Sequence, residues 1–156
     1  MTLLELFERL EASALGAAIR DSPWLFQVIV AAHLLGLSLL GGAVLVVDLR
    51  LLGVGLAQRP VAYVARQLEP WLVGAIAVLG ATGVPLFLSE AVKCFYSGAF
   101  RLKMVALALA LAFTFGVRNP LAKAQPLSAR WNRAVATCSL ALWLAGAAAG
   151  RWIGFS

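Results

Sequence analysis

Charged residues are scarce in this sequence. Only 13% of its 156 residues are Asp, Glu, Lys or Arg, whereas 62% are hydrophobic. An ordinary soluble domain has roughly a quarter charged and half apolar residues. A domain of this length hides only about 70% of its unfolded surface, so in water much of the apolar surface would stay exposed. The composition excludes an ordinary soluble domain and predicts that lipid surrounds most of the chain.

Residues that carry chemistry are equally few. The sequence contains two cysteines, Cys94 and Cys138, and a single histidine, His33. Two cysteines make no disulfide framework, and these three residues give no cluster with zinc spacing. There is also no Ser/His/Asp arrangement, Gly-rich phosphate loop or pair of carboxylates on one helix face. We therefore expect no enzyme that works with its own side chains alone, so any reaction would need a cofactor.

Four long apolar runs dominate what the sequence does contain, and each is close to the ~20 residues that cross a bilayer. They cover residues 23–47, 70–91, 101–118 and 131–153. Each must be helical, because a segment in hydrocarbon can satisfy its backbone polar groups only internally. Ser22-Pro23 and Glu69-Pro70 predict helix starts with proline in the first turn, and Asn119-Pro120 predicts the end of the third helix.

Residues 1–22 have a different pattern. Their apolar side chains fall on one helical stripe, and Thr2 with Glu5 forms a capping-box pattern. We predict a helix that lies in the membrane interface, and the acidic residues of this segment argue against a cleaved signal peptide. The expected fold is all-α: an integral membrane four-helix bundle over residues 23–156, preceded by an amphipathic interfacial helix over residues 1–22.

Basic residues are concentrated around the two short connections at 48–69 and 118–130. The positive-inside rule puts these connections in the cytoplasm and both termini outside. On the outer side, we expect Glu90 and Lys103 to pair across the second and third spans. The net charge of +6 then anchors the protein to anionic lipid and requires no nucleic-acid partner.

Two charged residues end the first span. Asp48 and Arg50 are two positions apart, so they point away from each other on a helix. Each is expected to find a partner on another span or loop, and Arg66 and Arg118 are the candidates for Asp48. We interpret these charges as structural anchors.

His33 lies about 13 Å inside the first predicted span, close to the bilayer centre. The same count along the other spans places Thr82 and Trp143 at that depth. Small residues, among them Gly36 and Gly80, accompany this layer, and small residues either let helices approach or leave room beside a bulky guest. The predicted site consists of His33, Thr82, Trp143, Gly36 and Gly80.

Three interpretations of His33 are open. The ring is neutral and structural, hydrogen-bonded to Thr82 or to a backbone carbonyl that the kink at Pro85 frees. Alternatively it is a metal ligand, an axial ligand of haem b, in a bundle that makes room between facing helices. In the third interpretation it lies on a path for protons or metal ions.

The stretches "SPWLFQVIVAAHLLGLSLLGGAVLVVDLRLLG" and "EPWLVGAIAVLGATGVPLFLSEAVKCFYSGAFRLKMVALALALAF" resemble an uncharacterised family of small four-span proteins of bacterial inner membranes. More distantly, "HLLGLSLLGG" is similar to a span of copper-resistance D-type proteins, which belong with membrane haem and copper handling. The resemblance implies a bacterial inner-membrane location and a role for His33. Relatives often carry a second histidine where this chain has Phe115-Gly116, which puts a two-histidine haem in doubt.

Together these patterns predict a small inner-membrane accessory or electron-transfer-linked protein in which His33 binds haem b. We expect it to assemble with itself or to be a subunit of a larger membrane complex. The alternatives are a cofactor-free scaffold subunit, whose histidine ties helices together, and a small metal or solute permease. A permease needs a continuous polar path through the bundle.

Overall fold

The computed structural model describes residues 2–124 and 128–152, and within them the chain forms helices and turns with no strand. In chain order the helices are α1 (Leu3–Glu11), α2 (Ala14–Asp21), α3 (Pro23–Leu52), α4 (Val61–Ser89), α5 (Ala91–Tyr96), α6 (Gly98–Phe113), the π-helical turn η1 (Thr114–Arg118), α7 (Asn119–Lys123) and α8 (Ala129–Trp152). The predicted all-α class is confirmed.

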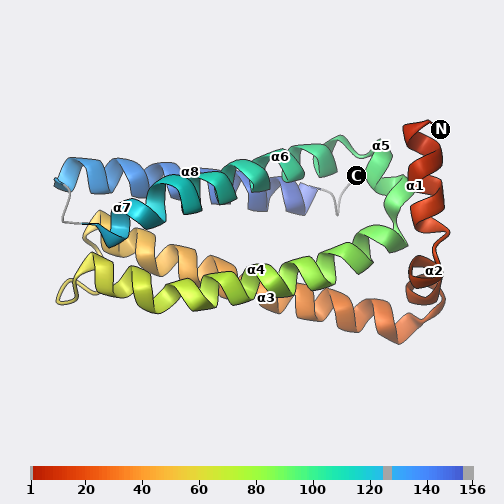
Figure 1. The fold of residues 1–156 in the computed structure, drawn as a ribbon, viewed down its shortest axis with the longest axis horizontal. Helices are drawn as coiled ribbons and strands as arrows, with labels where there is room; N and C mark the ends of the chain where they lie inside the picture. Colours follow the sequence, from red (N-terminus) through yellow and green to blue (C-terminus); the bar gives the residue numbers. More distant parts are fainter. Residues whose placement is uncertain (1, 125–127, 153–156) are drawn as a thin grey trace.

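Four stretches of the described chain are long and apolar enough to cross a membrane. They are Pro23–Leu52, Val61–Ser89, Gly98–Lys123 and Ala129–Arg151. They lie side by side as an elongated bundle, with α1 and α2 across one end (Figure 1). We name that end the α1 end and the opposite one the α7 end. The predicted four-helix membrane bundle is confirmed, and the protein is a multi-pass membrane protein.

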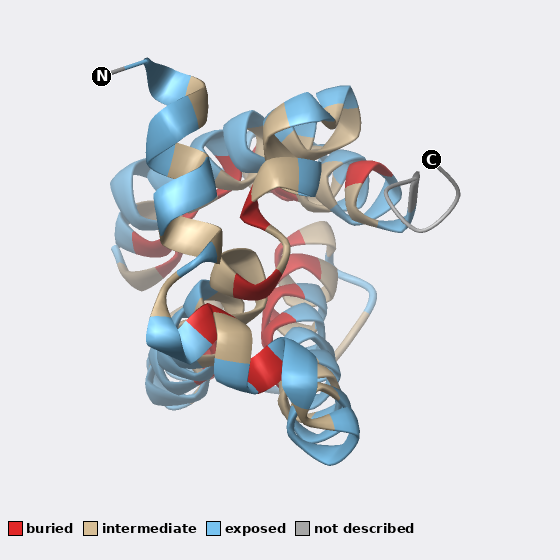
Figure 2. Cartoon of the chain, turned by 90° about the vertical axis from the view of Figure 1, so that its right-hand side faces the viewer, coloured by how far each residue is buried: buried red, intermediate tan, exposed pale blue. Residues whose placement is uncertain are grey.

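The bundle consists of two helical hairpins, α3 with α4 and α6 with α8. They are joined mainly toward the α7 end, where α3 contacts α8 and α4 contacts α7, and they diverge toward the α1 end (Figure 1). One buried cluster forms this joint and consists of Val47, Leu51, Val64, Ala65, Ala122, Val135 and Ala136. A second cluster lies between α3 and α4, with Trp143 of α8 packed against it, and consists of Leu40, Ala43, Val44, Leu72 and Ala75. Buried residues face inward, while most of the outer surface is exposed (Figure 2). That exposed apolar surface suits a lipid environment.

The second span begins earlier than predicted. α4 starts at Val61, nine residues before Pro70, and Pro70 lies inside the helix. The predicted helix start at Glu69-Pro70 is therefore wrong. Proline removes one backbone donor, but Val64 and Ala65 are both buried in the joint. This packing carries the helix through the proline, and the Glu69 carboxylate accepts a hydrogen bond from Lys123 instead of capping the helix.

The third span continues beyond Asn119-Pro120, so the predicted end of the helix there is also wrong. After α6 the chain widens into η1 and then enters α7 without a break. Arg118 and Asn119 are buried, and Arg118 Nη1 donates to Asn119 Oδ1 at 2.9 Å. Pro120 falls in the first turn of α7, where a missing N–H costs little.

The N-terminal segment forms two helices where one was predicted. The capping box is confirmed, because Glu5 N donates to Thr2 Oγ1 at 3.3 Å and Thr2 N donates to Glu5 Oε2 at 3.0 Å. The chain then breaks at Ser13, whose hydroxyl accepts from Gly16 N at 3.2 Å and caps α2. Ser competes with the helical backbone in this way, which explains the break.

Both N-terminal helices are attached to the α1 end of the bundle. Val92 N, at the start of α5, donates to Glu11 Oε2 at 2.6 Å, and Arg20 Nη1 donates to the Ser89 carbonyl at 3.1 Å. Phe7 packs edge-on against Phe87 and Phe95, with ring centroids 5.6 and 5.2 Å away. α1 and α2 therefore form a cap over the bundle end, and their place in the membrane interface stays a prediction.

Candidate functional site

His33 lies on the core face of α3. It precedes Gly36 by three residues and Leu40 by seven, and both of these are buried. Residues at this spacing share one face of a helix. The half-buried imidazole therefore extends the stripe by which α3 packs into the bundle, toward the α1 end.

Thr82 on α4 is the side-chain partner of the His33 ring. The Thr82 hydroxyl lies 2.7 Å from the Val78 carbonyl, to which it donates, and 2.8 Å from His33 Nδ1. A hydroxyl has only one proton, so when that proton points to the Val78 carbonyl the Thr82 oxygen accepts from His33. In that arrangement the proton of a neutral ring lies on Nδ1, and Nε2 has a free lone pair.

The glycines near His33 differ in their surroundings. Gly83 touches the ring, because a Cβ built there would lie 3.4 Å from His33 Cε1. At Gly36 a Cβ would lie 3.1 Å from Val78 Cγ1, so this glycine serves the contact between α3 and α4. Gly80 has no neighbouring atom within 4 Å of its Cβ position. It lies two residues before Thr82 and so on the opposite side of α4. Gly83, which was not predicted, is the glycine with the His33 ring as its nearest neighbour, and a role of Gly36 and Gly80 in a site stays a prediction.

Trp143 packs nearer the α7 end of the bundle than His33 does. Its indole Nε1 donates to Thr114 Oγ1 at 3.1 Å, and its ring packs against the cluster that contains Leu40. Leu40 is seven residues, or roughly 10 Å, farther along α3 than His33. Helical side chains lean toward the N-terminus of their own helix, and α3 and α8 run in opposite directions. Equal depth along the backbone therefore does not bring the two rings together, and Trp143 does not share the surroundings of His33.

A buried ion pair joins three spans near the α7 end. Arg118 Nε donates to Asp48 Oδ1 at 2.8 Å, and the two side chains are only 1% and 0% exposed. Ser139 on α8 donates to Asp48 Oδ2 at 2.7 Å, and Arg118 Nη2 donates to the Val44 carbonyl at 2.8 Å. The predicted partner Arg118 is confirmed for Asp48. Ser139 was missed, because a lone serine among apolar residues carries no pattern that names its partner.

Arg50, two residues after Asp48, also finds its partner outside α3. Arg50 Nε donates to the Arg59 carbonyl at 2.6 Å, in the connection between α3 and α4. This agrees with the expectation that Asp48 and Arg50 reach partners on different parts of the chain.

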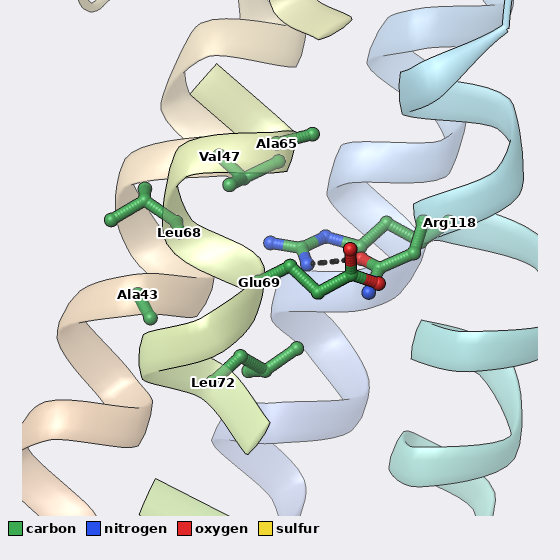
Figure 3. Close-up of a pocket in the computed structure, with 8 residues that line it drawn as sticks. Ala43, Val47, Ala65, Leu68, Glu69, Leu72 and Arg118 are labelled. Carbon is green, nitrogen blue, oxygen red and sulfur yellow. Dashed lines mark hydrogen bonds between the residues drawn. The ribbon is translucent and has the colours of Figure 1, made fainter. Parts of the chain in front are cut away.

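A narrow crevice lies beside the ion pair. Arg118 reaches into it from η1, and the wall formed by α3 and α4 includes Ala43, Leu68 and Glu69 (Figure 3). The crevice is too tight to hold a water molecule. Because every buried side-chain polar atom in the described part of the chain has a hydrogen-bond partner, this region offers no free group to a ligand. We interpret it as a structural joint.

The charges near the α1 end pair differently from the prediction. The Glu90 carboxylate lies 3.6 Å from Lys93 Nζ, one turn away, so the expected Glu90 to Lys103 pair is wrong. Lys93, three residues from Glu90, is the nearer base. The side chain of Lys103 lies along α8 instead. A Cβ built at Gly150 would lie 3.6 Å from Lys103 Cε.

Few of the donors that metals prefer come together. Within residues 2–124 and 128–152, no group of three or more His, Cys, Asp or Glu side chains forms a metal-binding cluster. Both cysteines are free. Burial, and next the charge of Glu90, raise the pKa of the Cys94 thiol, which keeps it protonated and a poor metal ligand at neutral pH.

Comparison with family models gives a match over nearly the whole chain. A family of unknown function (DUF6644) matches residues 6–156, nearly the whole chain. The chain belongs to this family. Neither a curated protein nor a solved structure matches the chain. The predicted resemblance to an uncharacterised family is confirmed, whereas the similarity to copper-resistance D-type proteins stays a prediction.

Proposed function

We propose that this protein binds haem b in the membrane, with Nε2 of His33 as an axial ligand of the iron, and that it serves as an accessory component of electron transfer. The observation that carries the proposal is the chain of hydrogen bonds from His33 Nδ1 through Thr82 to the Val78 carbonyl. It holds the ring in the tautomer whose Nε2 can bind a metal.

The number of protein donors favours haem over a bare metal ion. Zinc sites take three or four protein ligands, and the described residues contain no group of three or more His, Cys, Asp or Glu that could supply them. A haem iron already has four porphyrin nitrogens and needs only one protein ligand. One histidine on the core face of a helix therefore suits haem, and the other axial position is left to a second copy of the chain or to an external ligand.

Each residue around His33 has a distinct role in this proposal. Thr82 fixes the orientation of the ring and raises the basicity of Nε2 by accepting from Nδ1–H. Gly83 has no side chain to press on the ring. The haem itself supplies reversible one-electron transfer when bound. Helical bundles bind haem between facing helices, and in this proposal the macrocycle would lie beside His33 on the core face of α3.

The visible spectrum of the protein purified in mild detergent tests this function. We expect the wild type to show a Soret band after expression in haem-replete cells, and His33→Ala to lose it, because the only axial donor on this face is gone. Ser38→Ala is the matched control, since Ser38 is exposed on the same helix and bonds only the Leu34 carbonyl. It should keep the band.

A colourless wild type that also binds no added haem would overturn the proposal. Helix content and a single size-exclusion peak show whether His33→Ala has folded. In the alternative function, a scaffold subunit without cofactor, the hydrogen bond between His33 and Thr82 only ties α3 to α4 and is worth about 0.6–2 kcal/mol.

We further propose that the protein lies in a bacterial inner membrane with both termini in the periplasm, on the strength of the basic residues near the α7 end. A C-terminal fusion to alkaline phosphatase should then be active, and a fusion after residue 57, in the connection between α3 and α4, should be inactive. The reverse pattern of activities would refute this orientation.

A further inference from the structure

Lys103 is a basic residue on the core face of a membrane-spanning helix. It precedes Ala110 by seven residues and Thr114 by eleven, and both are buried. These positions fall on one side of α6. Lys103 itself is half-buried. Ionisable side chains in such positions are rare, and they usually mark a site or a pathway.

The Lys103 ammonium has no acidic partner in the described part of the chain. Glu90, the acid predicted to pair with it, lies 3.6 Å from Lys93, and Glu11 lies 3.9 Å from Arg20. The stem of Lys103 runs along Gly150, where the Cβ position is 3.7 Å from Cδ and 4.0 Å from Nζ. These are van der Waals distances, so the lysine stem packs alongside α8 at this glycine.

Lys103 lies at the same level of the bundle as His33. α3 and α6 run in the same direction, and Asp48 and Arg118 join them near the α7 end. His33 precedes Asp48 by fifteen residues, and Lys103 precedes Arg118 by fifteen, so each is about 22 Å from the ion pair. The Lys103 charge also acts electrostatically on His33. The nitrogen proposed to bind the iron and a cation without an acidic partner among the described residues therefore lie at one level of the bundle, on the two different hairpins.

We propose that Lys103 binds a carboxylate of the ligand that His33 holds, namely a propionate of the haem. This inference rests on the proposed function. A porphyrin that carries propionates needs one donor for its iron and a cation for its acid groups, and the chain places one of each at one level. A carboxylate at Lys103 would also compensate the cost of keeping an ammonium among apolar helices.

Titration with two forms of haem tests the role of Lys103. Purified protein in mild detergent is titrated with haem b and with its dimethyl ester, and the Soret absorbance gives each dissociation constant. We expect the wild type to bind the free acid about tenfold more tightly than the ester, as a charge-assisted hydrogen bond predicts. Lys103→Met should lose this preference and bind the ester unchanged, whereas Lys103→Arg should keep the preference.

Arg101→Met is the matched control, because Arg101 is exposed and lies two residues away on another side of α6. It should leave both constants unchanged. Equal binding of acid and ester by the wild type would overturn the inference while the His33 proposal stands. Loss of phospholipid from purified Lys103→Met, with the preference for the acid intact, would show a lipid phosphate as the partner and would also overturn it. If His33→Ala binds both forms as well as the wild type does, the proposed function itself fails.

Discussion

Replacing Arg118 with methionine is expected to lower the free energy of unfolding by about 3–5 kcal/mol. The substitution leaves Asp48 buried with Ser139 as its only remaining side-chain partner, and an unpaired carboxylate away from water is costly. Methionine keeps most of the volume, so the loss comes from the charge and the hydrogen bonds, not from a cavity. Unfolding by SDS in mixed micelles, followed by circular dichroism, measures the change.

The double variant Asp48→Asn/Arg118→Met separates the charge from the packing. It removes both charges and keeps an amide that can accept from Ser139, so it should recover much of the lost stability. Arg133→Met, at an exposed position of α8, should change stability by no more than about 0.5 kcal/mol. A single variant Arg118→Met as stable as the wild type would show that the ion pair does not hold the hairpins together.

Replacing Thr82 with valine is expected to weaken haem binding about 10- to 100-fold. Valine has nearly the shape of threonine but cannot accept from His33 Nδ1–H, so the ring loses the bond that fixes its tautomer and orientation. The iron ligand His33 is retained, and the effect therefore reports the support given by Thr82. Haem titration followed at the Soret band measures it.

Thr82→Ser is the conservative control, since serine keeps the hydroxyl that donates to the Val78 carbonyl and accepts from His33. We expect its haem affinity to stay within a few-fold of the wild type. If Thr82→Val and Thr82→Ser bind haem equally well, the hydrogen bond does not prepare His33 as a ligand.

The fold was predictable to the extent that hydrophobicity alone determines it. Four apolar runs of spanning length gave the four-helix bundle, and the capping box at Thr2 and Glu5 gave the start of α1. The ends of the spans were less predictable. The rules for Pro70 and Pro120 describe a helix in isolation, whereas here buried partners on other helices hold the chain in helical form across both prolines.

The contacts of the site were predictable where two residues at the same depth in the membrane lie on directly packed helices. Counting residues from the span ends brought His33 and Thr82 together, because their side chains meet across one pair of packed helices. The same count failed for Trp143, whose side chain leans away along an antiparallel helix. Lys103 was predicted to pair with Glu90 across the second and third spans, whereas Glu90 lies beside Lys93, three residues away in the sequence.

The cap formed by α1 and α2 decides from which direction a large apolar molecule reaches His33. These helices close the end of the bundle nearest the imidazole, and the stacked rings of Phe87 and Phe100, 5.8 Å apart, close the corner between α4 and α6. These two helices belong to the two different hairpins, which are joined mainly toward the α7 end. If His33 binds haem as proposed, the cap would block access along the bundle axis, and haem would arrive sideways from the hydrocarbon, so that the bilayer acts as the reservoir from which the protein is loaded.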